Sequence, residues 1–228
     1  MVGAVIRAGE GRDLVGIFAQ GGICRGFANS LGQRNWFAAH SFDMGWSFYH
    51  QADKAVKTTY AGFEWDDAEF ARKVDWAGEQ LEVLSRPPRT IAPGEVRTYL
   101  APTALAEFVG MLGGGFGLKA CRTKSTVLLK MIEDGATLSP AVTFRENTRE
   151  GIAPNFQGEG FLKPDEVTLV EAGKFANCLV SPRSAKEYGE QVNSGGEGPS
   201  SGDMAAGDIP VDDVLRRLDT GVYANTLW

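Results

Sequence analysis

A glycine-centred hairpin constrains the fold of this chain more than any other segment. A short apolar run, residues 167–170, leads to Gly173, which supplies the positive φ angle that a tight turn needs. Residues 174–180 then alternate Phe, Asn and Leu with Ala, Cys and Val, which is the pattern of a returning strand. The sequence therefore predicts two antiparallel strands joined by a tight turn.

A short helix is predicted directly after this hairpin. Ser184 stands in the position of an N-cap, and Glu187, three residues later, completes a capping box. Gly189 occupies the position of a left-handed C-terminal cap, so the helix is expected to be about one turn long.

Composition excludes several classes of protein. The chain has 228 residues, 43% of them apolar, which is enough for one large or two small domains. Its net charge of −6 argues against a general nucleic-acid binder. We find no apolar run of about 18 residues and no charged-then-apolar leader, so no membrane span is expected. Cys24, Cys121 and Cys178 lack Cys-x-x-Cys spacing and are interpreted as small, reduced core residues of a cytoplasmic protein.

The first third of the chain is expected to form antiparallel β structure. Residues 14–19 and 24–29 are predicted to pair as a hairpin around Gly21-Gly22. Residues 36–50 make the clearest strand, because apolar residues at even positions alternate with small and polar ones. Gly45 within this strand suggests a bulge or a turn.

A helix over residues 66–85 is expected to cover this sheet. Asp66 is a suitable N-cap, with Glu69 in the capping-box position. The apolar residues that recur at helical spacing are Phe70, Val74, Ala77, Leu81 and Leu84. A sheet followed by a covering helix indicates an α+β fold.

The proline-rich segment at residues 87–94 is interpreted as a linker, because it cannot continue a helix. Beyond it, residues 102–112 are predicted to form a helix with Pro102 in its first turn, and residues 128–133 and 141–146 to form strands. The glycine cluster at 113–117 follows a helix instead of preceding one, which excludes a phosphate-binding loop of the usual kind.

The last part of the chain contains a low-complexity segment. Residues 189–207 are poor in large apolar groups and are interpreted as a solvent-exposed loop, with a mobile flap over a substrate groove as the alternative. A short helix is predicted to start near Pro210, and residues 222–228 are predicted to form a final strand.

Three segments resemble those of a known family. Residues 169–179 are similar to the "L-I-E-x-G-x-L-x-x-Y-L" hairpin of the TldD/PmbA family, metalloprotease-related proteins also named modulators of DNA gyrase. Residues 184–189 resemble the family's "S-A-x-x-x-G" helix, and residues 155–161 its "D-x-E-G" segment. The resemblance extends over nearly the whole chain.

The resemblance implies an α+β fold of antiparallel β-rich sheets with a few covering helices, in two parts. Residues 1–86 correspond to the second half of the family's N-terminal domain, 87–94 to a linker, and 95–228 to its β-rich C-terminal domain. Family members begin before Met1 and continue beyond Trp228. The chain is therefore expected to be a fragment that lacks the segment from which catalytic members draw a cysteine zinc ligand.

The resemblance also bears on the active site. Catalytic members carry a His-Glu-x-x-x-His motif, in which histidines bind zinc and the glutamate takes a proton from the attacking water. The matching positions here are Ala106, Glu107 and Met111, so the glutamate is present and both histidines are absent. The sequence is thus similar to the PmbA/TldE branch, with no metal or cofactor of its own and zinc expected only in a TldD-like partner.

The two histidines of the chain do not restore a metal site by spacing. His40 and His50 are ten residues apart, over about 30 Å along one continuous strand. A fold-back near residues 43–45 would bring them together and remains an alternative. We find no Gly-x-Ser-x-Gly motif for a nucleophilic serine.

The function that the resemblance implies is that of a non-catalytic subunit in a cytoplasmic, oligomeric two-subunit protease acting on unfolded or modified peptides. Its expected partners are a TldD-like catalytic subunit and the peptide substrate, with neither nucleic acid nor a membrane. Two alternatives remain: a self-sufficient metallopeptidase, and a non-enzymatic modulator that binds DNA gyrase.

Overall fold

The computed structural model describes residues 1–51, 54–151 and 153–227, and these residues group into two compact units. The first unit consists of Met1–Cys24 and Ala38–Val96. The second consists of Arg25–Phe37 and the chain from Arg97 onward. The predicted domain boundaries, 1–86 and 95–228 with a linker at 87–94, stay a prediction, because grouping by contacts does not show that either segment folds by itself.

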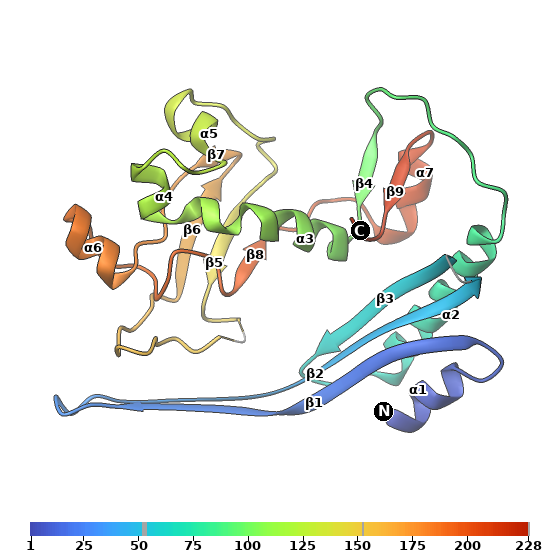
Figure 1. Ribbon diagram of the computed structural model, residues 1–228, viewed down its shortest axis with the longest axis horizontal. Coiled ribbons are helices and arrows are strands. Elements are labelled where there is room, and N and C mark those ends of the chain that lie inside the picture. Colours follow the sequence, from blue (N-terminus) through green and yellow to red (C-terminus); the bar gives the residue numbers. More distant parts are fainter. Residues whose placement is uncertain (52–53, 152, 228) are drawn as a thin grey trace. The chain divides into compact units, whose positions relative to one another are not determined.

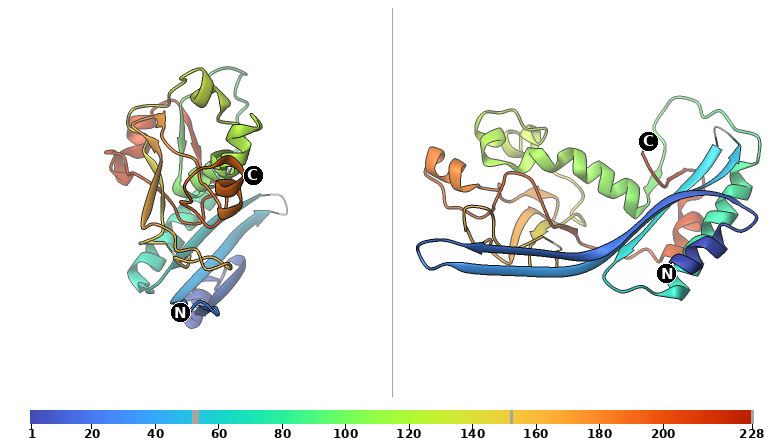
Figure 2. Two further views of the ribbon diagram at one scale, coloured as in Figure 1. Left: turned by 90° about the vertical axis from the view of Figure 1, so that its left-hand side faces the viewer. Right: turned by 60° about the horizontal axis from the view of Figure 1, so that its bottom comes forward.

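The first unit is a three-stranded sheet with helices on one face (Figure 1). Its strands follow the order β1-β2-β3. Its elements are α1 (Val2–Ala8), β1 (Asp13–Ala28), β2 (Arg34–Gln51), β3 (Lys54–Gly62) and α2 (Asp67–Leu84). The ends of β1 and β2 within Arg25–Phe37 belong to the second unit. Ala4, Val5 and Ala8 of α1 pack against the same core as α2, and α1 lies beside α2 (Figure 2).

The predicted hairpin around Gly21-Gly22 is wrong. Both glycines lie inside the continuous strand β1, and neither has a positive φ angle. The chain instead reverses at residues 29–33, where Gly32 has φ +86°. The Asn29 side chain accepts hydrogen bonds from the backbone N–H groups of Leu31 and Gln33, both at 3.1 Å, which stabilises this turn.

Strand β2 confirms the predicted alternation over part of its length. Phe42, Met44, Trp46 and Phe48 are buried, whereas Trp36 at the same parity is 69% exposed. The register with β3 is regular at Gly45, which pairs with Thr59, and the irregularity lies between Tyr49 and Gln51. The bulge predicted at Gly45 is therefore displaced towards the end of the strand.

Helix α2 confirms the predicted cap and apolar face. The Asp66 carboxylate accepts hydrogen bonds from the backbone N–H groups of Ala68 and Glu69, at 2.8 and 3.3 Å. Its buried residues are Phe70, Val74 and Ala77. They form one core with the buried side chains of β2 and with Val56 and Tyr60 of β3.

The second unit is built on a four-stranded sheet in the order β7-β6-β5-β8. All neighbouring pairs in this sheet are antiparallel. Its elements are α3 (Pro102–Leu112), η1 (Gly113–Phe116), α4 (Leu118–Arg122), α5 (Leu129–Glu133), β5 (Phe144–Asn147), β6 (Glu166–Glu171), β7 (Lys174–Phe175), α6 (Pro182–Tyr188) and β8 (Gly202–Met204). The predicted α+β fold class with antiparallel sheets and covering helices is confirmed.

The glycine-centred hairpin forms as predicted, with a shorter second strand. Ala172 and Gly173 have φ angles of +46° and +79°, so the turn uses the left-handed region at both positions. Strand β7 ends at Phe175, although Ala176 N still donates to Leu169 O at 2.9 Å. The remaining residues of the predicted strand pair elsewhere, because Leu179 bridges to Gly117.

Two local predictions in this unit are wrong. Residues 129–133 form helix α5 instead of a strand, which shows that a short apolar run does not distinguish the two. Helix α6 is capped by Ser181, whose hydroxyl accepts a hydrogen bond from Ser184 N at 3.2 Å, so Ser184 lies inside the helix. The left-handed cap at Gly189, with φ +70°, is confirmed.

A small parallel pair completes the second unit. Strand β4 (Thr98–Leu100) pairs with β9 (Val222–Ala224), and the rings of Tyr99 and Tyr223 stack with centroids 5.3 Å apart. The predicted helix near Pro210 appears as η2 (Val211–Asp213) and α7 (Val214–Leu218). Trp228, in the predicted final strand, lies outside the described residues. Among the described residues, no helix is long and apolar enough to cross a membrane.

Candidate functional site

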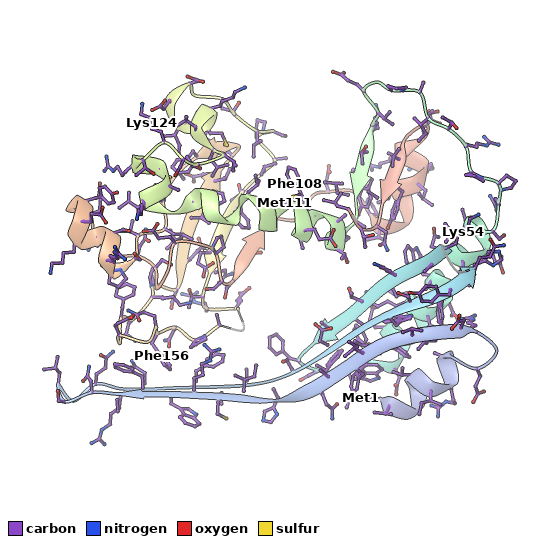
Figure 3. All side chains as sticks on the ribbon, in the orientation of Figure 1. Met1, Lys54, Phe108, Met111, Lys124 and Phe156 are labelled. Carbon is purple, nitrogen blue, oxygen red and sulfur yellow. The ribbon has the colours of Figure 1, made fainter. Side chains whose placement is uncertain are left out.

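Helix α3 is the element on which the family resemblance places the catalytic motif. It begins with Pro102, whose fixed φ angle suits the first helical position, and it contains the fully buried Ala104. Val109 and Leu112 pack against the core of the second unit. Phe108 and Met111 are more exposed apolar side chains of this helix, at 44% and 67% (Figure 3).

Glu107 of this helix contacts the C-terminal end of the described chain. Its Oε2 atom accepts a hydrogen bond from Leu227 N at 2.8 Å. The side chain is half-buried. Glu107 therefore connects α3 to a segment 120 residues away, which gives this carboxylate a structural role.

The residues around Glu107 do not fit a zinc ion. Ala106 has no donor atom, and the thioether of Met111 is a soft, weak partner for zinc. Residues 106 and 111 are five positions apart, and because each residue of a regular helix turns by about 100°, their side chains point about 140° away from each other. Converging ligands at that spacing need a distorted turn such as a π-bulge, and α3 is a regular α-helix over its whole length.

His40 and His50 are not brought together. Both are exposed on β2, and this strand is continuous through residues 43–45, so the fold-back left open by the sequence does not occur. At about 3.3 Å per residue the two side chains start about 33 Å apart. Within residues 1–51, 54–151 and 153–227, no group of three or more His, Cys, Asp or Glu side chains is placed to hold a metal ion.

Each histidine has a local environment instead. A Cβ atom at Gly22 would lie 2.9 Å from Cε1 of His40, so the ring rests directly on the glycine of the neighbouring strand. His50 lines a hollow of about 290 Å³ together with Arg12, Glu82 and Ser85. These contacts place both histidines on the surface of the first unit.

A buried carboxylate that the sequence did not reveal organises the low-complexity segment. Glu146 of β5 is 2% exposed. It accepts hydrogen bonds from Ser200 N at 2.9 Å, Ser200 Oγ at 2.6 Å and Ser201 N at 3.0 Å. Lys163 Nζ lies 4.0 Å from Glu146 Oε1 and donates to Ser200 Oγ at 3.2 Å. The pKa of Lys163 is lowered by burial, and Glu146 acts in the opposite direction.

The predicted loop at residues 189–207 is irregular apart from β8, as expected, but these contacts fix part of it to the sheet. Strand β8 within this segment pairs with β5 and becomes an edge of the sheet. Asn193 also donates to Cys178 O at 2.9 Å and accepts from Val180 N at 2.8 Å. We call residues 189–207 the strap, because Asn193 binds the segment after β7 and β8 joins the sheet.

Two hollows adjoin the strap in the second unit, with volumes of about 510 and 550 Å³. They share Asn177 and residues 191–193, so they form neighbouring parts of one surface depression. No motif in the sequence pointed to it, because its walls come from segments far apart in the chain: α4, α5, residues 161–168, the end of the hairpin and the strap.

Comparisons with known proteins identify a family and a shared fold. A family profile described as the PmbA/TldA metallopeptidase C-terminal domain matches residues 93–228. A comparison with curated proteins finds no match.

Solved structures share the fold. TldE from Thermococcus kodakarensis has a TM-score of 0.75 at 17% identity, covering 99% of this chain and 55% of that one. A candidate modulator of DNA gyrase from Bacteroides thetaiotaomicron has a TM-score of 0.77 at 13% identity, covering 97% and 53%. Another from Thermotoga maritima has a TM-score of 0.73 at 15% identity, covering 92% and 51%.

The chain spans about half the length of these structures, and at such identities the likeness shows the fold alone. The family profile, in contrast, covers more than half of this chain, including α3, the hairpin, the strap and β9. This chain belongs to the PmbA/TldD family of metallopeptidase-related proteins.

Proposed function

We propose that this chain is a non-catalytic, PmbA/TldE-like subunit of a two-subunit protease that acts on unfolded or modified peptides. The observation that carries the proposal is the chemistry of α3. Its Ala106 and Met111 positions offer no zinc ligands, and its Glu107 carboxylate holds the backbone of Leu227. A TldD-like partner supplies the zinc and the hydrolytic chemistry.

Strand edges are the elements suited to contact a peptide or a partner. Strand β1 lies at the edge of its sheet, with exposed Val15 and Ile17. An edge strand offers backbone N–H and C=O groups that add an extended peptide irrespective of its sequence. This property suits a subunit that handles unfolded chains.

The name of one solved structure with the same fold supports the branch assignment. That protein is named TldE. Two other structures with this fold are described as candidate modulators of DNA gyrase. Binding to DNA gyrase is therefore the alternative function that an experiment must distinguish from the proposed one.

Replacing Glu107 by Gln tests the proposal directly. The amide oxygen of Gln still accepts the hydrogen bond from Leu227 N, so the fold of α3 is kept. We expect peptide hydrolysis by the assembly of this chain with a TldD-like subunit from the same organism to change by less than about 3-fold. Loss of a general base costs about 100-fold or more.

The matched control is the same Glu→Gln change at the general base of the catalytic subunit, which should abolish hydrolysis. A loss of about 100-fold on Glu107→Gln would contradict the proposal and favour a self-sufficient metallopeptidase. Capture of DNA gyrase by this chain without any TldD-like partner would favour the modulator alternative.

A further inference from the structure

Two cysteines distant in sequence meet in the second unit. Cys121 lies in α4, and Cys178 lies in the extended segment after β7. Backbone hydrogen bonds hold these segments together, from Leu179 N to Phe116 O at 2.8 Å and from Leu118 N to Leu179 O at 3.0 Å. The two thiols are brought together by the pairing of these two segments and not by a local sequence motif.

The two thiols are in hydrogen-bonding contact and open to small molecules. The sulfhydryl of Cys121 hydrogen-bonds with Cys178, and Cys121 Sγ also lies 3.5 Å from Gly115 O. Both side chains are partly buried, and both line the hollow of about 510 Å³ beside the strap. Two interacting thiols that line one hollow are a pair that a disulfide can join.

The electrostatic surroundings distinguish the two sulfurs. The pKa of Cys178 lies below its usual value, mainly because the Cys121 thiol hydrogen-bonds to it, and Arg122 acts in the same direction; burial, Glu190 and Glu197 oppose the shift. The pKa of Cys121 is raised by the same hydrogen bond and by burial. The thiolate therefore forms preferentially on Cys178, which makes it the better nucleophile of the two.

We propose that Cys121 and Cys178 are the site of a reversible disulfide, formed by exchange with a low-molecular-weight disulfide that enters this hollow. The Cys178 thiolate attacks one sulfur of that molecule, forms a mixed disulfide and releases one small thiolate, which takes up a proton. Cys121 then loses its proton, and its thiolate attacks the Cys178 sulfur and releases the second small thiolate. The small disulfide gains two electrons and two protons, and the protein gains one S–S bond.

The bond would join α4 to the segment that leads into α6 and so fix one wall of the hollow. The third cysteine is placed differently. Cys24 lies exposed on β1, contrary to its predicted place in a core, and it serves as an internal example of a single accessible thiol. This proposal goes beyond the proposed function and does not depend on peptidase activity.

Oxidised glutathione is the probe that tests the proposal. The purified chain is incubated with it, alkylated, digested and analysed by mass spectrometry without reduction. We expect a peptide pair that links Cys121 to Cys178 and disappears after reduction, while Cys24 carries glutathione. The linked pair should form at least about 10-fold faster in the folded chain than in urea, because folding places the thiols in contact.

A Cys121→Ser variant adds the mechanistic control. Without its resolving thiol, Cys178 should retain glutathione as a stable mixed disulfide. Recovery of Cys121 and Cys178 in the wild-type chain as unmodified thiols, as two separate mixed disulfides, or linked only to Cys24 would overturn the proposal. Equal linking rates in the folded chain and in urea would overturn it as well.

Discussion

Replacing Phe48 by Ala should lower the free energy of unfolding by about 4 kcal/mol, the typical cost of removing a fully buried aromatic ring. Phe48 is 0% exposed and lies opposite Val56 of β3. The guanidinium carbon of Arg12 lies 5.0 Å from the centroid of its ring. The substitution removes these contacts and leaves a cavity that the sheet and α2 only partly fill. Urea unfolding followed by tryptophan fluorescence measures the effect, since Trp46 lies in the same core.

Trp36→Ala is the matched control on the same strand. Trp36 has the same parity on β2 as Phe48, yet it is 69% exposed. We expect it to cost less than about 1 kcal/mol, as an exposed side chain does. Equal destabilisation by the two substitutions would contradict the assignment of Phe48 as buried and Trp36 as exposed.

Replacing Glu146 by Ala should lower the free energy of unfolding by about 3 kcal/mol, because buried groups would lose their partner. The backbone N–H groups of Ser200 and Ser201 would lose an acceptor, and the amine of Lys163, whose side chain is only 7% exposed, would lose its counter-charge. The strap should detach locally, so amide hydrogens of β8 should exchange faster. Urea unfolding and hydrogen exchange measure the two effects.

Glu150→Ala provides the comparison for this prediction. Glu150 is exposed shortly after β5, and we expect its removal to change stability by less than about 0.5 kcal/mol. Unchanged exchange in β8 after Glu146→Ala would contradict the role assigned to Glu146 as the anchor of the strap.

Local chemistry predicted much of the fold. The Asp66 cap, the Pro102 start of α3, the left-handed turn at Gly173 and the cap at Gly189 each depend on a few neighbouring residues, and each appears in the structure. Their physical causes, a capping hydrogen bond or a permitted φ angle, are visible in the sequence.

Predictions that depended on distant partners failed. Gly21-Gly22 permits a turn, but it is extended within β1, which pairs with β2, and the reversal falls at residues 29–33. The composition of the strap predicts a loop but not its anchor, because Glu146 lies 54 residues before Ser200, and only the folded sheet brings them together.

The candidate site shows the same limit. The sequence located α3, because helix signals are local, whereas the assignment of Ala106, Glu107 and Met111 to a zinc motif stays a prediction. It did not show that Glu107 holds Leu227, that Cys121 meets Cys178, or that the strap forms part of a hollow. Each of these contacts joins segments that pair only in the folded second unit.

The most direct test of a non-catalytic role is the zinc content of the purified protein, measured by elemental analysis alone and after assembly with a TldD-like subunit. We expect no stoichiometric zinc in this chain alone and one equivalent per assembled pair, since α3 offers no converging ligands. Stoichiometric zinc in this chain alone would contradict the assignment.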